Sequence, residues 1–448
     1  MNDETGRKLG LPECTALLIG GMIGSAIFSL SGITMYSAGP ASVISWIAAG
    51  FIMLFYGLLM AELAGLYPVS GGVYVFPRMA FGGKTGKILG WLACWSSILT
   101  NLVAVSFAAI YVSIYLSVSI PAVSGYQIPL AILTILACVF LNVIRFDISG
   151  KINTGLVIIL ILTMTVFVIS AFFSGKYDAG LLHPFFTQGA DGSLGFISAV
   201  PTAIFGYSSI ISIAYLVSDV RNPGKTIPKS TFISILVVSS VYALIILSTM
   251  GLITAGYLAE NPDMQYIPVF AACFTALSEI PWLATVVSIA ASLSLITTMS
   301  VCISITSRSL QAVSNDGILP PFFDRVTSYG VPAVAAAITG FITICMVCFP
   351  ENVSILINFG AIFNVISIVI TILAVYKARK KETYTESSFK TPGGFILPTL
   401  LILILFICNI SGIITGGRNI WIYTGFFLLL GMIIFFSGNA RAEERSNL

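Results

Sequence analysis

Residues 20–28 read Gly20-Gly21-Met22-Ile23-Gly24-Ser25-Ala26-Ile27-Phe28, and this stretch decides how the rest of the chain is interpreted. It lies inside an apolar run from about Cys14 to Tyr36 that is long enough to cross a bilayer. Three glycines and a serine stand where a plain membrane helix carries Leu or Val. Because freed backbone groups inside a membrane need partners, the interruption predicts a helix that breaks around a ligand. A small-residue packing seam is the alternative.

The composition places the chain among polytopic membrane proteins. Of its 448 residues, 57% are hydrophobic and only 9% are charged, and the mean hydropathy is +1.01. Such values lie outside the range of soluble domains. We expect a single membrane domain over residues 1–448, with no cofactor and no nucleic-acid partner. The cysteines fall in apolar runs and predict packing positions without a disulfide framework. Cys345 and Cys348 are spaced like half a metal site, but no second pair joins them, so no metal is expected.

Apolar windows of about 17–25 residues predict an all-α membrane protein with twelve transmembrane helices. The first run has no small-residue cleavage site, so we interpret it as a retained span and not as a signal peptide. The predicted spans are about 13–36, 41–67, 88–118, 127–144, 153–174, 194–217, 230–255, 281–306, 332–349, 353–376, 395–415 and 419–437.

The placement of Lys and Arg tests this topology through the positive-inside rule. With both termini in the cytoplasm, only Lys176 and Arg418 fall on the outer side, which leaves 19 of the 21 basic residues on the cytoplasmic side. One missed or invented span would scramble this alternation downstream. The bias therefore predicts a multi-pass protein of the plasma or inner membrane.

A second interruption, Ile204-Phe205-Gly206-Tyr207-Ser208-Ser209, lies in the sixth span, five helices after the first. Two broken spans in corresponding positions of two five-helix units indicate an inverted-repeat transporter. We place the first repeat at about 13–174 and the second at about 194–376. The two spans at about 395–437 then lie outside the repeats.

Several short motifs follow one another in the order that this topology requires. They are Gly24-Ser25-Ala26-Ile27-Phe28, Ala61-Glu62-Leu63, Pro68-Val69-Ser70-Gly71-Gly72-Val73-Tyr74, Phe81-Gly82, Gly90-Trp91, Asp219-Val220-Arg221-Asn222-Pro223, Ile227-Pro228, Ser307-Arg308, Asn315-Asp316-Gly317-Ile318-Leu319-Pro320 and Gly330-Val331-Pro332. Together they resemble the signatures of the amino acid, polyamine and organocation transporters (the APC superfamily). The resemblance covers residues 10–335 and implies a LeuT-like fold with broken helices one and six.

The resemblance also implies a substrate site made of backbone groups. The N–H groups of Ser25 and Ala26 would hold a carboxylate, the carbonyls of Met22 and Ser208 would hold an ammonium, and Phe205 would be an aromatic gate. Half-helix termini carry partial charges that suit a zwitterion. The substrate-binding residues that follow are Met22, Ile23, Gly24, Ser25, Ala26, Phe205, Gly206, Tyr207, Ser208, Ser209, Ser96 and Ser97.

Two departures bear on the substrate. Ala26 stands where the family has Gly, and its methyl group removes backbone freedom and room at a point of close approach. That change points to either a different local backbone or a different substrate size. In the sixth span, the family often has an acidic or Gly residue where this chain has Ser208, Ser209 or Ile211. With Ser96 and Ser97, the two serines would line a polar, uncharged pocket, unless these hydroxyls bond to their own helix carbonyls.

Charge is nearly absent from the middles of the predicted spans, although mid-membrane ionisable groups typically mark proton relays and cation pockets. Leu160 aligns with a fifth-helix lysine of proton-coupled relatives, which disfavours a lysine-gated symporter. Thr297 and Thr298 in the eighth span are candidate Na⁺ ligands, and interhelical hydrogen bonding is the alternative.

Four polar residues cluster near the predicted cytoplasmic mouth: Tyr74, Arg78, Asp219 and Arg308. They would form an inner gate by ion pairing, or they would staple loops together.

These features favour a secondary transporter of small neutral amino acids that works by alternating access as an exchanger. An ion-coupled symporter, or a transporter of cationic amino acids or polyamines, stays open as the alternative. An intramembrane enzyme would need a nucleophile and a base or a metal, and the only histidine, His183, lies in an outer loop without a partner pattern. A channel would show a repeated filter or a charged ring. The exact substrate, the coupling ion, and the choice between monomer and homodimer are left open.

Overall fold

The computed structural model describes residues 9–69, 71–144, 151–215, 217–328, 330–348, 353–381, 389–415 and 417–446. Side chains are described for all of these residues except 24–25, 151–154, 353–356, 410–420 and 441–446. The described residues are overwhelmingly helical, and the one strand-like feature is an isolated parallel bridge between Leu9 and Val220. The all-α expectation is therefore confirmed for this part of the chain.

Most of the helices follow the predicted apolar windows along the chain, whereas those over residues 72–81, 255–260 and 268–275 lie between windows. They are α1 (Leu11–Ser25), α2 (Ser31–Ala38), α3 (Ser42–Leu66), α4 (Gly72–Phe81), α5 (Gly83–Ser119), α6 (Gln127–Val143), α7 (Lys151–Phe173), α8 (Gly195–Ser198), α9 (Val200–Gly206), α10 (Pro223–Met250), α11 (Ala255–Glu260), α12 (Pro268–Thr275), α13 (Pro281–Asn315), α14 (Ala333–Val347), α15 (Val353–Arg379), α16 (Ile396–Thr415) and α17 (Gly417–Ser446). Pro223, Pro268 and Pro281 each begin a helix, where a missing N–H costs no hydrogen bond.

Eight helical stretches of the described residues are long and apolar enough to cross a membrane. The stretch Leu11–Leu66 is 56 residues long and contains the first two predicted spans. Three shorter apolar helices, Gln127–Val143, Ala333–Val347 and Ile396–Asn409, coincide with further predicted spans. The chain is therefore a protein with several membrane-spanning helices.

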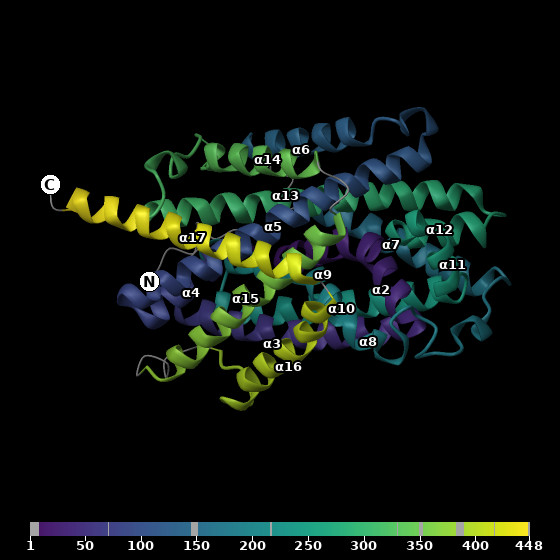
Figure 1. Cartoon of the computed structure of the whole chain (residues 1–448), viewed down its shortest axis with the longest axis horizontal. Coiled ribbons are helices and arrows are strands. Elements are labelled where there is room, and N and C mark those ends of the chain that lie inside the picture. The colour runs from purple at the N-terminus through teal and green to yellow at the C-terminus, as the bar shows by residue number, and fades with distance from the viewer. Residues whose placement is uncertain are drawn as a thin grey trace.

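Two long helices form the middle of the molecule (Figure 1). α5 has 37 residues and α13 has 35, and the two pack against each other. At 1.5 Å per residue α5 is about 55 Å long, which exceeds the hydrocarbon thickness of a bilayer. α1 packs against α10 and α13, and α3 packs against α10. The first predicted span is thereby enclosed by other helices.

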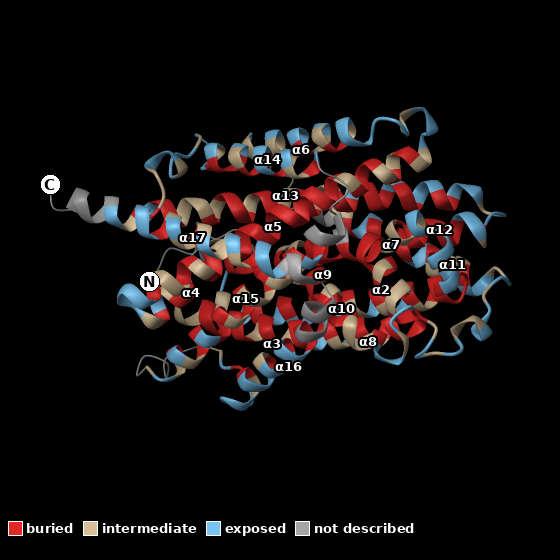
Figure 2. Ribbon diagram, viewed as in Figure 1, coloured by how far each residue is buried: buried red, intermediate tan, exposed pale blue. Residues whose placement is uncertain are grey.

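Burial follows this arrangement, with buried residues in the centre and exposed ones on the outer faces (Figure 2). α6 and α14 lie together along one edge of the molecule (Figure 1). Their outward side chains are large and apolar, including Leu133, Phe140 and Phe341 at 62–68% exposure. Such surfaces are stable against lipid and not against water. Cys345 on α14 and Cys348, which directly follows that helix, are also exposed, so the expectation that these two cysteines fill packing positions is wrong.

A buried ion pair joins α3 to the end of α15. The guanidinium of Arg379 donates from Nε and Nη2 to the two carboxylate oxygens of Glu62, each at 2.7 Å. The side chains are 4% and 1% exposed, respectively. The backbone N–H of Thr391 donates to the same carboxylate at 2.9 Å, and its hydroxyl donates to the carbonyl of Leu58 at 3.0 Å. The segment before α16 is thereby attached to α3.

Candidate functional site

The first predicted span changes helix type without leaving the helix. α1 runs through Gly20 to Ser25, and a π-helical segment, η2 (Ala26–Leu30), follows directly and leads into α2. The expectation of an unwound stretch within Gly20–Phe28 is therefore wrong in form, and the irregularity begins at Ala26. Backbone N–H and C=O groups inside a membrane must be hydrogen-bonded. A π-helical turn keeps most of them paired within the helix, whereas an unwound segment would need a ligand to pair them. Single π turns inside α-helices are frequent at functional sites.

Hydroxyl groups from three neighbouring helices bond to carbonyls around this irregularity. Thr298 of α13 donates to the carbonyl of Gly21 at 3.3 Å, and Tyr242 of α10 donates to that of Met22 at 2.6 Å. Tyr115 of α5 donates to the carbonyl of Phe28 at 2.7 Å. These bonds reach carbonyls on both sides of the junction at Ala26. The chain itself thus supplies partners that we expected a ligand to supply.

The sixth predicted span also changes type, at the predicted place. α9 ends at Gly206, Tyr207 has φ −94° and ψ 1°, and a 3₁₀ helix, η7 (Ser208–Tyr215), continues the span. Eight residues are long for a 3₁₀ helix, whose hydrogen bonds are poorer than those of an α-helix. Ser208 is half-buried and Ser209 is buried. The small and polar residues at 206–209 therefore mark a real change in the backbone.

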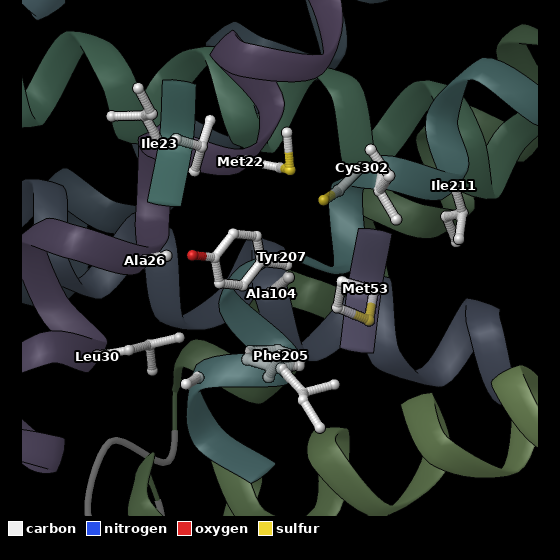
Figure 3. Packing of buried hydrophobic residues seen from close by; sticks show 14 of the residues in the cluster. Met22, Ile23, Ala26, Leu30, Met53, Ala104, Phe205, Tyr207, Ile211 and Cys302 are labelled. Carbon is white, nitrogen blue, oxygen red and sulfur yellow. The ribbon is translucent and has the colours of Figure 1, made fainter. Parts of the chain in front are cut away.

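The two irregularities touch each other. A Cβ placed on Gly206 would lie 2.8 Å from the Cβ of Ala26 and 2.9 Å from the indole ring of Trp46. A Cβ placed on Gly21 would lie 3.0 Å from that of Ser209. Gly206 must therefore be glycine because the Ala26 methyl group and the Trp46 ring occupy the space above it. Figure 3 shows Met22, Ala26 and Tyr207 facing a common region.

Three aromatic rings pack behind this contact. The rings of Trp46 and Tyr242 lie 4.7 Å apart at 79°, and those of Tyr207 and Tyr242 lie 5.2 Å apart at 68°. The hydroxyl of Tyr207 donates to the carbonyl of Trp46 at 3.2 Å and shares a 3.0 Å hydrogen bond with Ser239. The Trp46 indole N–H donates to Thr34 at 2.9 Å. The polar ends of these buried rings are therefore paired.

Phe205, the predicted aromatic gate, faces α5 and α15. Its ring lies 5.9 Å from that of Phe107, and a Cβ on Gly360 would lie 3.3 Å from it. Ser96 and Ser97 are buried on α5. Two hydrogen bonds stay on that helix: Thr100 donates to the carbonyl of Ser96, and Asn101 donates to the Ser97 hydroxyl. The side chain of Ser97 also interacts with the hydroxyl of Tyr215, the last residue of η7, so Ser97 adjoins the irregular part of the sixth span.

The remaining predicted substrate residues occupy α1. Met22 and Ile23 are fully buried. Gly24 and Ser25 are the last two residues of α1, and only their backbone is described.

A small cavity of about 10 Å³ lies between α1, α7 and α13. Gly20 of the interrupted first span lines it, together with Leu160 and Thr297, the two lining positions considered for ion coupling. The space fits about one water molecule. However, the Thr297 hydroxyl donates to the carbonyl of Ser294 at 2.7 Å, and that of Thr298 donates to Gly21. The hydroxyl of Thr298 thus has the interhelical hydrogen-bonding role.

The four polar residues predicted to form one inner cluster separate into two contacts. Tyr74 donates to the carboxylate of Asp316, with which Arg78 also pairs. Burial, followed by the Asp316 carboxylate, raises the pKa of the Tyr74 hydroxyl well above its ordinary value, so Tyr74 stays a donor. Arg308 and Asp219 form the second pair, with N and O 3.9 Å apart and side chains 41% and 49% exposed.

The sequence interpretation missed the residues that hold the two irregularities: Trp46, Tyr115, Tyr242 and, at the inner contacts, Asp316. Asp316 stood within a quoted motif and could have been found there. The aromatic residues lie in otherwise apolar spans and carry no local signal.

The amino-acid sequence is similar to those of known transport proteins. A family model described as "Amino acid permease" matches residues 9–437. The chain is 28% identical to the branched-chain amino acid permease BcaP of Bacillus subtilis (strain 168), covering 96% of this chain and 92% of that protein. It is 26% identical to the methylthioribose transporter of the same organism, over 94% and 92%. It is 24% identical to the cationic amino acid transporter 3, mitochondrial, of Arabidopsis thaliana, over 84% and 63%.

Proposed function

The chain belongs to the amino acid permease family, and on that premise we propose that it exchanges small neutral amino acids across a cell membrane by alternating access. Its relatives are transporters and not enzymes. The relatives' names cover branched-chain amino acids, cationic amino acids and methylthioribose. The proposal for neutral amino acids rests on the site, where described contacts come from methyl, hydroxyl, aromatic and backbone groups.

The observation that carries the proposal is the direct contact between two helix irregularities, at Ala26 and at Gly206. Substrate would bind where they meet, with its carboxylate on the N–H groups of Ser25 and Ala26. Its ammonium would bind the carbonyls of Met22 and Ser208. The Ala26 methyl group and the Trp46 ring take up room beside Gly206, which favours a small or slender side chain. The valine, leucine and isoleucine class is the first to test.

The proposed topology has twelve spans, with residues 13–174 and 194–376 as inverted repeats and 395–437 as additional helices. An even number of spans would put the segments before the first span and after the last span on the same side of the membrane. The positive-inside bias favours the cytoplasm for that side.

Counterflow in liposomes tests the function. Labelled leucine trapped inside should leave faster when unlabelled leucine, isoleucine or valine is added outside. An unchanged efflux rate across the neutral amino acids would contradict exchange.

Ion coupling is the second candidate, because Gly20, Ser294 and Thr297 line one small cavity. Replacing Na⁺ by choline, or collapsing the proton gradient, should leave exchange unchanged if the first candidate is right. Loss of transport without Na⁺, together with a changed Na⁺ dependence in Thr297→Val, would favour the symporter instead.

A further inference from the structure

Tyr242 occupies a backbone acceptor that the proposed function assigns to the substrate. Its hydroxyl donates to the carbonyl of Met22 at 2.6 Å, and Met22 and Tyr242 are both fully buried. We propose that Tyr242 is an internal competitor for the substrate's ammonium group, bonding to this carbonyl when the site is empty and releasing it when an amino acid binds. This inference rests on the proposed function.

The distance lies within the range of about 2.5–3.0 Å that hydroxyl–carbonyl hydrogen bonds take. The bond lies in the interior, where the carbonyl of a residue within α1 still has a second lone pair, and leaving that lone pair unpaired costs free energy. A site that binds an ammonium through backbone carbonyls has this difficulty whenever it is empty. Tyr242 removes it by supplying a neutral donor in place of the charged one.

α10 contacts both irregularities with one face. Ser239 and Tyr242 are three residues apart, so they lie on the same side of the helix. Ser239 shares a hydrogen bond with Tyr207, beside Gly206, at 3.0 Å, while Tyr242 reaches Met22. The ring of Tyr242 also packs edge-on against the ring of Tyr207. If Tyr242 moves when it releases the Met22 carbonyl, its contact with the ring of Tyr207 would transmit that movement to the sixth span.

An ammonium group can win this competition because it is charged. Hydrogen bonds from an ionised donor are roughly twice as strong as neutral ones. The substrate would thus displace the tyrosine, and part of its binding free energy would be used to break the existing bond. Without the tyrosine hydroxyl there is no bond to break, so the substrate should bind more tightly.

Tyr242→Phe tests the competition, and Tyr115→Phe is the matched control. Tyr115 is also fully buried and donates at 2.7 Å to a carbonyl of the same span, that of Phe28, which the proposed site does not use. Leucine affinity of the full-length protein in detergent should rise about 2- to 12-fold in Tyr242→Phe, as expected from a net hydrogen bond. Tyr115→Phe should change it less than twofold. 4-Methylpentanoate, which is leucine without its amino group, should gain nothing in either variant.

Weaker leucine binding in Tyr242→Phe would overturn the proposal, because the hydroxyl would then be orienting the carbonyl for the substrate. Equal changes in both variants would also overturn it, since they would report general loosening of the span. Tyr242→Met keeps a large side chain without a donor and answers the same question if the Phe variant does not purify. If the wild type binds leucine and the affinity of Tyr242→Phe is the same, only the proposed competition is contradicted. If the wild type binds no amino acid, the proposed function is contradicted as well.

Discussion

The backbone carbonyls around the irregularity in the first span accept hydrogen bonds from other helices, whereas the backbone of the sixth span at Gly206 is in close packing contact with its neighbours. Around Ala26, hydroxyl groups from three helices bond to carbonyls of Gly21, Met22 and Phe28. Around Gly206, the absence of a side chain lets Ala26 and Trp46 approach the backbone to within contact distance. The first can change partners with little change of shape. The second cannot take an added atom without a shift of one helix.

This difference suggests a division of work between the two spans. Hydrogen-bond partners can be exchanged for those of a ligand, so the first span is suited to recognising backbone-like polar groups. A packed contact either fits or does not, so the sixth span is suited to limiting size. Substitutions that remove a hydroxyl and substitutions that add a methyl should therefore act differently at the two places.

The largest effect is expected from Gly206→Ala. Its new Cβ would lie 2.8 Å from the Cβ of Ala26, closer than real carbon contacts allow. We expect loss of most transport activity and a destabilisation of about 1–3 kcal/mol, the usual cost of overpacking. Thermal unfolding in detergent and leucine counterflow measure the two effects. Gly155→Ala is the control, because nothing lies within 4 Å of the added Cβ there. Equal stability and transport in the two variants would contradict the inference that the sixth span is closely packed at Gly206.

Ala26→Gly should have an effect on stability and transport between those of the other two variants. It adds room at the contact, whereas Gly206→Ala removes room. It deletes one buried methyl group, at about 0.8 kcal/mol, and adds the backbone freedom of glycine. We expect a lower melting temperature together with a broader range of accepted side chains, measured by competition of phenylalanine and methionine with labelled leucine. The swap Ala26→Gly/Gly206→Ala should be more stable than the sum of the single variants predicts. Strict additivity would mean that the two residues do not share one space.

Thr298→Val should have the smallest effect. It removes a 3.3 Å hydrogen bond to the Gly21 carbonyl while keeping the shape of the side chain. A destabilisation of about 0.5–1 kcal/mol is expected, with transport largely retained. Thr165→Val is the comparison variant, because its hydroxyl bonds only to its own helix at Ile161. A large loss of transport in Thr298→Val alone, with a changed Na⁺ response, would instead support an ion site.

The positions of the helices could be predicted because length and apolarity decide them. The change at Gly206 was also visible, since small and polar residues interrupt an apolar run there. The π turn at Ala26 was not, because residue type does not determine whether a backbone N–H bonds four or five residues back. Tyr242 could not be paired with Met22 either: 220 residues separate them, and the rotation of α10 decides which of its residues faces α1.

The resemblance to a known family predicted where the site would lie but not how its side chains are oriented. Ala26 was identified as a departure, and the structure relates it to Gly206 across the contact. Phe205 was expected over the site, yet its ring packs toward Phe107 and Gly360. Such orientations depend on the packing of several helices together, which no local pattern encodes.

The Glu62–Arg379 pair has a consequence for biosynthesis, because its partners are 317 residues apart in the chain. At about 5–20 residues per second, Glu62 is synthesised roughly 15–60 s before the arginine that neutralises it. During that interval the end of α3 carries a carboxylate without its final partner, and its attachment to Thr391 is also missing. The last quarter of the chain therefore completes a contact made by α3, and a nascent chain ending before Arg379 should be a preferred target of membrane quality control.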